Sequence, residues 1–201
     1  LLEKRQFTAE GLELTLATNL IGPFLLTHLL LDKLQAGAHA AASPSRVIFV
    51  SSGGMYAQKL DLKKLLSKSG RFDGVVAYAQ TKRALVIINE LFAKRFFDHD
   101  ISFHAMHPGC GYSGPSMRGL PRFWKLTRRI LRTPKQGADT IVWLAVCPHI
   151  GRQSGKFWYD LKPRRTHYVY ETMESTEARE KLWHPGQLGL CRRGTRKQPM
   201  P

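Results

Sequence analysis

The chain has 201 residues, a length typical of one domain, and 43% of them are hydrophobic, enough for a buried core. It carries 31 basic and 15 acidic residues, a net charge of +16, which keeps nucleic acid, anionic membranes and phosphate-bearing ligands among the candidate partners. Its three widely spaced cysteines form neither a zinc motif nor a disulfide framework. We therefore expect no metal site and an intracellular location, cytoplasmic or membrane-associated.

The first helix is predicted over residues 8–36. The chain starts without a methionine, lacks the order of a secretory signal, and reads as part of something longer. Thr8 fits an N-cap, and the dense apolar content that follows predicts a helix buried on more than one side. The most apolar run, residues 20–31, is shorter than the roughly 20 residues that cross a bilayer.

Asn19 lies in the middle of this predicted helix. A buried amide without partners costs roughly 1–3 kcal/mol, so Asn19 needs hydrogen bonds. Gly22 and Pro23 follow it and should loosen the helical hydrogen bonds and free backbone groups nearby. Asn19 is therefore either a satisfied core residue or part of a site.

The next predicted element is a buried parallel strand at residues 46–50, after a loop of small residues at 37–45. The strand is followed by Ser51, Ser52 and two glycines. Hydroxyls just beyond the carboxyl end of a parallel strand lie where open α/β sheets bind ligands. Ser52 is thus a candidate site residue, although serine and glycine also occur in ordinary turns.

A second long helix is predicted to contain Tyr78 and to end near residue 97, after a long excursion at 55–76 with a short helix at 61–66. Tyr78 and Lys82 are four positions apart, so they share one helix face. An adjacent ammonium favours the phenolate form of a tyrosine, which would make the pair a general acid/base. Alone, such a pair is more often a chance pair of surface neighbours.

Residues 101–106 alternate in polarity and predict the next strand, which ends in the turn 107–111. Strand, helix and strand in this order indicate a parallel α/β fold. Three more elements follow: a helix capped by Thr133 and Pro134 and ending at residue 146, a last strand at 154–160, and a terminal helix at 171–183. The tail after residue 183 is rich in Pro, Gly and basic residues and predicts disorder.

Residues 118–135 form the most basic stretch, with seven basic residues, no acidic one, and the aromatic residues Phe123 and Trp124. A solvated basic helix face explains this pattern most simply. Contact with an anionic membrane is the alternative. Nucleic acid is disfavoured, since no base-reading or RNA motif occurs.

Several of these features together resemble the short-chain dehydrogenase/reductase family. They are Asn19 within Asn-Leu-Ile-Gly-Pro-Phe, Ser52 at the end of Val-Ile-Phe-Val-Ser-Ser, Tyr78 and Lys82 in Tyr-Ala-Gln-Thr-Lys, a His-Pro-Gly turn and a late Ser-Gly-Lys-Phe strand. The resemblance covers about residues 5–165. Further runs, such as Ser-Ser-Gly-Gly-Met, Phe-Asp-Gly, Gln-Gly-Ala-Asp-Thr and Asp-x-Lys-Pro, point to one branch of the family.

This resemblance implies hydride transfer between NAD or NADP and a small-molecule carbonyl or alcohol. Tyr78 would exchange a proton with the substrate oxygen, and Lys82 would assist it and bind the nicotinamide ribose. Ser52 would hydrogen-bond the substrate oxygen. Asn19 would hold a water that links Lys82 to solvent.

The resemblance also assigns the other cofactor contacts to the turn after residues 101–106. Pro108 and Gly109 would join Tyr78 and Lys82 there. Ser113 would take the place of a threonine that binds the carboxamide in relatives.

The sequence departs from the family at its start. Members open with a strand, a glycine-rich turn and a helix that hold the pyrophosphate, and carry Asn-Asn-Ala-Gly after the fourth strand; neither motif occurs here. We therefore expect the C-terminal half of a Rossmann-like doubly wound parallel sheet, the family's strands 5 to 7 with flanking helices, without the nucleotide-binding first half. The strand at 46–50 would then form an apolar edge.

By this interpretation residues 1–165 are a partial catalytic domain, and residues 166–201 are a terminal helix and basic tail. Two hypotheses remain open. The chain is either an NAD(P)(H)-dependent oxidoreductase or a truncated, inactive remnant that cannot bind cofactor and acts as an interaction or membrane-surface module. Neither the substrate nor the oligomeric state follows from the sequence.

Overall fold

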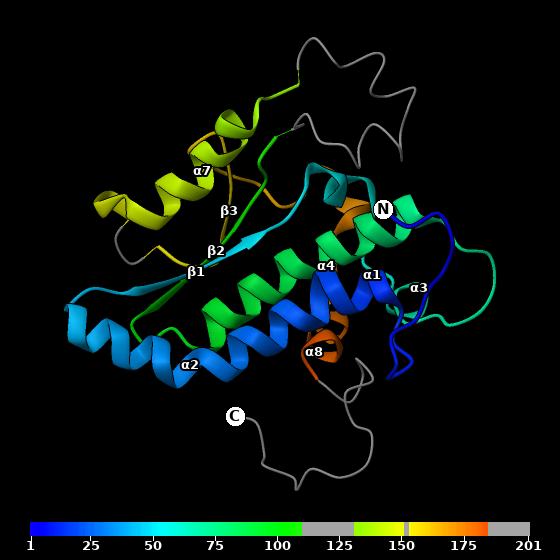
Figure 1. Ribbon diagram of the computed structural model, residues 1–201, viewed down its shortest axis with the longest axis horizontal. Helices are drawn as coiled ribbons and strands as arrows, with labels where there is room; N and C mark the ends of the chain where they lie inside the picture. The colour runs from blue at the N-terminus through cyan, green and yellow to red at the C-terminus, as the bar shows by residue number, and fades with distance from the viewer. Residues whose placement is uncertain (110–130, 151–152, 185–201) are drawn as a thin grey trace, which may run out of the picture.

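A computed structural model describes residues 1–109, 131–150 and 153–184 (Figure 1). Its sheet has the strand order β1-β2-β3-β4, in which β1 (Ser45–Val50), β2 (Ile101–Met106) and β3 (Lys156–Tyr159) are parallel. The three predicted strands and their parallel pairing are confirmed. The short antiparallel strand β4 (Lys162–Arg164) was not expected.

Helices cover both faces of this sheet (Figure 1). The long helices α2 (Gly22–Ala41) and α4 (Gly74–Arg95) lie on one face, and α7 (Pro134–Val146) lies on the other. All six residues of β2 are buried, because this central strand is covered on both faces. The sequence of β2 alternates in polarity, but both faces of the strand are buried.

The first helix begins later than predicted. Thr8 lies in a turn, with its backbone N–H bonded to the Leu12 carbonyl and Gly11 at a φ of 76°, and Phe7 and Glu13 form an isolated antiparallel bridge. Helix α1 (Leu14–Leu16) then starts with Glu13 as its N-cap, whose carboxylate accepts hydrogen bonds from two backbone N–H groups. The prediction of a Thr8 cap was wrong because this turn separates it from the helix.

The helix also runs further than predicted. It continues through a π-helical turn, η1 (Ala17–Ile21), and through the whole of α2, so that residues 37–41 are helical rather than a loop. The alanines in this stretch are strong helix formers, which explains the extension. Helix α2 ends at Ala41, and its C-cap Ala42 has a left-handed φ of 48°.

Only one side of α2 is buried. Phe24 and Leu31 face the core, whereas Leu26, Leu29 and Leu30 are 61%, 76% and 42% exposed. The prediction of burial on more than one side is therefore wrong. The helical stretch Leu14–Ala41 has 28 residues and contains an 18-residue window with a mean hydropathy of 1.6, so it could cross a membrane by length and composition alone, a test that the core helix of a soluble protein also passes.

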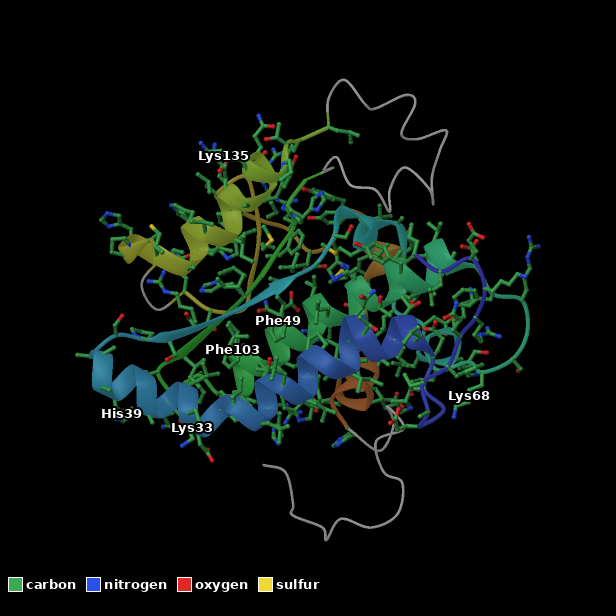
Figure 2. The ribbon with its side chains drawn as sticks, viewed as in Figure 1. Lys33, His39, Phe49, Lys68, Phe103 and Lys135 are labelled. Atoms are coloured by element: carbon green, nitrogen blue, oxygen red, sulfur yellow. The ribbon has the colours of Figure 1, made fainter. Side chains whose placement is uncertain are left out.

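The main core lies between the sheet and the pair α2 and α4. Figure 2 shows Phe49 from β1 and Phe103 from β2 in this layer. Both rings pack on Phe92 of α4, at centroid distances of 6.1 and 5.3 Å. Trp183 closes this cluster edge-on, 4.8 Å from the Phe92 ring. Burial of aromatic surface thus joins the two strands to the helix that carries Tyr78.

The other predicted helices are present with small shifts. They are α3 (Leu62–Leu65), α4, α7 and α8 (Thr176–Trp183), and each begins at a side-chain cap: Asp61, Asp73, Thr133 and Ser175 respectively. Two 3-10 turns are η2 (Gly53–Ala57), after β1, and η4 (Tyr170–Thr172), before α8. Ser113, most of the basic stretch 118–135 and the tail beyond residue 184 lie outside the described residues.

Candidate active site

The candidate site lies where α4 crosses the carboxyl end of β1. The Ser51 hydroxyl donates a hydrogen bond to the Lys82 carbonyl at 2.9 Å. In return, the Lys82 ammonium donates to the Val50 carbonyl at 2.9 Å. These two bonds hold the helix against the strand end, which is the edge where open α/β sheets bind ligands.

Tyr78 and Lys82 lie together on this face of α4. The Lys82 Nζ is 5.6 Å from the centroid of the Tyr78 ring, as the i, i+4 spacing predicts. Burial lowers the pKa of Lys82 from its ordinary value of 10.5. The ammonium is therefore a stronger hydrogen-bond donor than an exposed lysine would be, and it lies beside the phenol.

Asn19 reaches the same region through Thr81. Its amide nitrogen donates to the Thr81 hydroxyl oxygen at 3.1 Å, and that hydroxyl donates to the Tyr78 carbonyl at 2.7 Å. Asn19 lies in the π-helical turn η1, where the Gly22 N–H bonds to the Ala17 carbonyl. Pro23 has no N–H to offer the Asn19 carbonyl, so the predicted loosening after Asn19 is confirmed.

Ser52 is the N-cap of the turn η2 and follows the end of β1 after one intervening residue, Ser51. Its hydroxyl oxygen accepts a hydrogen bond from the Gly54 N–H at 3.2 Å. A Cβ built on Gly54 would be 3.7 Å from this oxygen and 3.9 Å from the Ala79 Cβ, so η2 packs against the first turns of α4. The hydroxyl proton of Ser52 remains available to a ligand oxygen, because the capping bond uses only an oxygen lone pair.

The turn after β2 forms the wall of the candidate site opposite η2. His107 stacks on Tyr159, with ring centroids 5.1 Å apart, and desolvation with Arg132 nearby lowers its pKa to about 4. Its imidazole is therefore neutral at pH 7. Gly109 has a φ of 87°, and a Cβ there would lie 2.5 Å from the Arg132 side chain. The positive φ favours glycine at this position, and the Arg132 side chain packs directly over its backbone.

The sequence did not reveal the roles of three residues at or near the site: Ser51, Thr81 and Arg83. Ser51 and Thr81 adjoin predicted site residues, and nothing local separates their roles from those of their neighbours. Arg83 follows Lys82 but is buried, with its guanidinium bonded to the Glu174 carboxylate at 2.6 Å and to the Met55 sulfur at 3.1 Å. A charged residue on the apolar face of a helix was the available signal for Arg83.

Comparison with known sequences finds relatives with similarity along most of the chain. Dehydrogenase/reductase SDR family member 12 from Homo sapiens is 38% identical over 182 residues, 90% of this chain and 55% of the relative. Human retinol dehydrogenase 13 is 30% identical over 208 residues, 96% of this chain and 59% of the relative. The chain thus spans little more than half the length of these relatives. No family model matches the sequence.

Solved structures show the same fold. A short chain dehydrogenase from Salmonella enterica matches 71% of this chain and 50% of its own, with a TM-score of 0.53 and 20% identity. The Pseudomonas aeruginosa RhlG/NADP active-site complex matches 71% of this chain and 53% of its own, with a TM-score of 0.52 and 20% identity. The sequence relatives and the common α/β architecture agree with the family resemblance of the sequence. The chain belongs to the short-chain dehydrogenase/reductase family.

Proposed function

We propose that this chain carries the catalytic half of an NAD(P)(H)-dependent oxidoreductase that interconverts a small-molecule carbonyl and an alcohol. The observation that supports this most strongly is the convergence at the end of β1. Tyr78 and Lys82 share one face of α4, the Lys82 ammonium is bonded to the Val50 carbonyl, and Asn19 is tied to the same turn through Thr81. The convergence brings together segments as far apart as residues 19 and 82.

In the proposed mechanism Tyr78 donates its phenolic proton to the substrate oxygen during reduction and recovers it during oxidation. Ser52 donates a hydrogen bond to the same oxygen, which gains negative charge as the reaction proceeds. Such a donor is worth roughly 2.7–4 kcal/mol of transition-state stabilisation. Lys82 stabilises the phenolate that proton donation leaves behind. Asn19 holds the first water of a path that returns the proton from solvent.

A nicotinamide cofactor, when bound, supplies the hydride. Lys82 is suited to hold the ribose hydroxyls, because its ammonium offers three donors and the Val50 carbonyl uses only one. The backbone of Pro108 and Gly109 would contact the other side of the cofactor. Ser113, to which the family resemblance assigns the carboxamide contact, lies outside the described residues. The Pseudomonas structure is an NADP complex, which supports a cofactor of this class but leaves NAD and NADP as alternatives.

We further propose that this chain corresponds to the C-terminal half of a doubly wound sheet, with residues 1–165 as its catalytic unit. Two surfaces support this proposal: the edge of β1 that no described strand pairs with, where Val50 is 41% exposed, and the exposed leucines of α2. Both would be covered by a first half that binds the adenine end of the cofactor. Under the remnant hypothesis these surfaces stay uncovered, and the chain binds no cofactor.

Titration of the chain with NADPH and NADH, followed by cofactor fluorescence, tests the proposal. We expect saturable binding at micromolar to millimolar cofactor, and reduction of an aromatic ketone that Tyr78→Phe abolishes. Lys82→Met should weaken cofactor binding, whereas Lys94→Met, near the far end of the same helix, should not. Absence of binding to the chain, both alone and joined to the missing half of a relative, would overturn the proposal in favour of the remnant.

A further inference from the structure

A cleft opens beside the candidate site, between η2 and the carboxyl ends of β2 and β3. Its volume is about 340 Å³, near the lower end for small-molecule sites. The lining residues are Gly53, Tyr56, His107, Phe157, Tyr159 and Arg164, together with Tyr168. Gly53 directly follows Ser52, and His107 directly precedes Pro108, so the cleft adjoins the residues assigned to catalysis and cofactor binding.

Aromatic rings form most of its walls. Tyr56 packs against Tyr168 at 4.7 Å between centroids, and edge-on against Phe157 at 6.0 Å. Tyr159 and the neutral His107 stack on the other side. Flat walls of this kind favour a planar, conjugated ligand, because ring stacking adds to the area that such a ligand buries.

The Tyr56 hydroxyl does not compete with Tyr78 for proton transfer. It donates to the Arg165 carbonyl at 2.6 Å, and burial together with a hydrogen bond to Tyr168 raises the pKa of Tyr56 well above its ordinary value. Tyr56 therefore stays protonated and fixes the wall in place. Its ring contributes contact area rather than acid/base chemistry.

The charge in the cleft comes from Arg164. Its Nε donates to the Tyr159 carbonyl at 3.3 Å, and its guanidinium carbon is 5.7 Å from the Tyr159 ring centroid. The neighbouring Arg132 is neutralised by an ion pair with Asp160, whereas within residues 1–109, 131–150 and 153–184 no carboxylate pairs with Arg164. The two terminal nitrogens of Arg164 can thus bind a carboxylate through both of its oxygens.

The segment that carries Tyr168 is held in place from behind. Arg83 bonds to the Thr166 carbonyl, to His167 and to the Glu174 carboxylate, all in the segment that follows β4. Both the Arg83 and Glu174 side chains are almost fully buried. The aromatic wall is therefore anchored to α4 one residue after Lys82, which makes the cleft largely pre-formed.

We propose that this cleft binds a planar, conjugated carbonyl compound that carries a carboxylate, with its rings against Tyr159 and Tyr168 and the carboxylate on Arg164. The proposal rests on the proposed function for the position of the reacting carbonyl, which would face Ser52. It also stands alone as a binding site, because stacking and the Arg164 contact do not depend on hydride transfer.

The test compares 4-acetylbenzoate with its methyl ester, a neutral analogue of the same shape, by calorimetry and saturation-transfer NMR on the full 201-residue chain. We expect the acid to bind at least about tenfold more tightly than the ester. Arg164→Gln should remove that advantage and leave the ester unchanged. Arg165→Gln, the matched control, alters an exposed arginine outside the cleft lining and should leave both affinities unchanged.

Equal affinities for the acid and the ester would overturn the proposal. So would an equal loss of affinity for the acid in Arg164→Gln and Arg165→Gln. Turnover separates it from the function proposed above. If the acid binds through Arg164 but is never reduced with cofactor present, the oxidoreductase proposal fails and the binding site stands. If both compounds are reduced with the same kcat/KM in wild type and in Arg164→Gln, the oxidoreductase proposal stands and the anion site fails.

Discussion

The Arg83 guanidinium and the Glu174 carboxylate form an ion pair of 2.6 Å in which the two side chains are only 1% and 2% exposed. The pair lies one residue beyond Lys82 and joins α4 to the segment after β4. Arg83 also contacts His167, the Met55 sulfur and two backbone carbonyls, and Glu174 also contacts His167 and Arg179. This cluster couples α4, the helix that carries Tyr78, to the wall of the neighbouring cleft.

Removing one charge of this pair should destabilise the fold strongly. In Glu174→Gln the buried Arg83 loses its counter-charge, and we expect the free energy of unfolding to fall by about 3–5 kcal/mol, measured in urea. Glu177→Gln is the control, because Glu177 is 76% exposed and forms an ion pair with Lys181 on the same helix. That exposed pair is worth at most about 1 kcal/mol. Similar losses in both variants would contradict the assignment.

Thr81→Val tests the link between Asn19 and the Tyr78 turn. The substitution keeps the shape but removes the hydroxyl that accepts from Asn19 and donates to the Tyr78 carbonyl. We expect a loss of about 1–3 kcal/mol in unfolding free energy, since Asn19 is left with an unpaired donor. Reductase turnover should fall together with it, whereas Thr81→Ser should retain both. Normal turnover in Thr81→Val would show that this link is not needed.

Gly53→Ala should disturb the cleft, whereas Gly54→Ala should not. A Cβ at Gly53 would lie 2.9 Å from the His107 Nε2, closer than real contacts allow, whereas the nearest atom to a Cβ at Gly54 is 3.7 Å away. His107 stacks on Tyr159, so its displacement should cost about 1–3 kcal/mol. Thermal unfolding measures the stability, and the NMR resonances of His107 report the shift of its ring. Equal melting temperatures for the two variants would count against the close packing.

Stability should depend on pH through His104 and His107. Burial lowers the pKa of each to about 4 from an ordinary 6.5, with Arg46 and Arg132 adding to the effect respectively. The unfolded chain therefore binds more protons between these values. The stabilising contribution is complete above pH 6.5 and is lost as the pH falls toward 4.

We expect a loss on the order of 1–3 kcal/mol per histidine across this window, measured by urea unfolding at several pH values. His107→Asn should flatten the profile. The exposed His39, at the end of α2, provides a control variant, His39→Asn, that should leave the profile unchanged. An unchanged profile in His107→Asn would refute the role given to this residue.

The exposed leucines of α2 should promote self-association of the isolated chain. Leu29 is 76% exposed, so Leu29→Glu should change the unfolding free energy by less than about 0.5 kcal/mol and reduce association, measured by light scattering after gel filtration. Leu31, which is 8% exposed, provides the contrast. Leu31→Glu should unfold the chain, because it buries a charge without a partner. Association that survives Leu29→Glu would place the contact elsewhere.

Local patterns were sufficient for most of the elements. The apolar run at residues 46–50 and the Thr133–Pro134 start of α7 were predicted, and α7 indeed begins with a capping box between Thr133 and Gln136. The loosened turn at Asn19 was also predictable, because it depends only on the nearby Pro23. Each of these features involves residues close together in the chain.

Features that depend on distant partners were not predictable. Arg83 and Glu174 are 91 positions apart, and Asn19 and Thr81 are 62 apart. The predicted position of the first N-cap was also wrong, because the bridge between Phe7 and Glu13 moves the cap from Thr8 to Glu13.

The sequence by itself determined most of the strands and helices and placed Tyr78 beside Lys82, because hydrophobic period, capping and the i, i+4 spacing act over a few residues. Only the tertiary structure decided which polar groups meet in the interior and which apolar faces remain bare. A buried charge or amide takes whatever partner the packing of the whole chain brings within about 3 Å, and that choice is written in no single stretch of sequence.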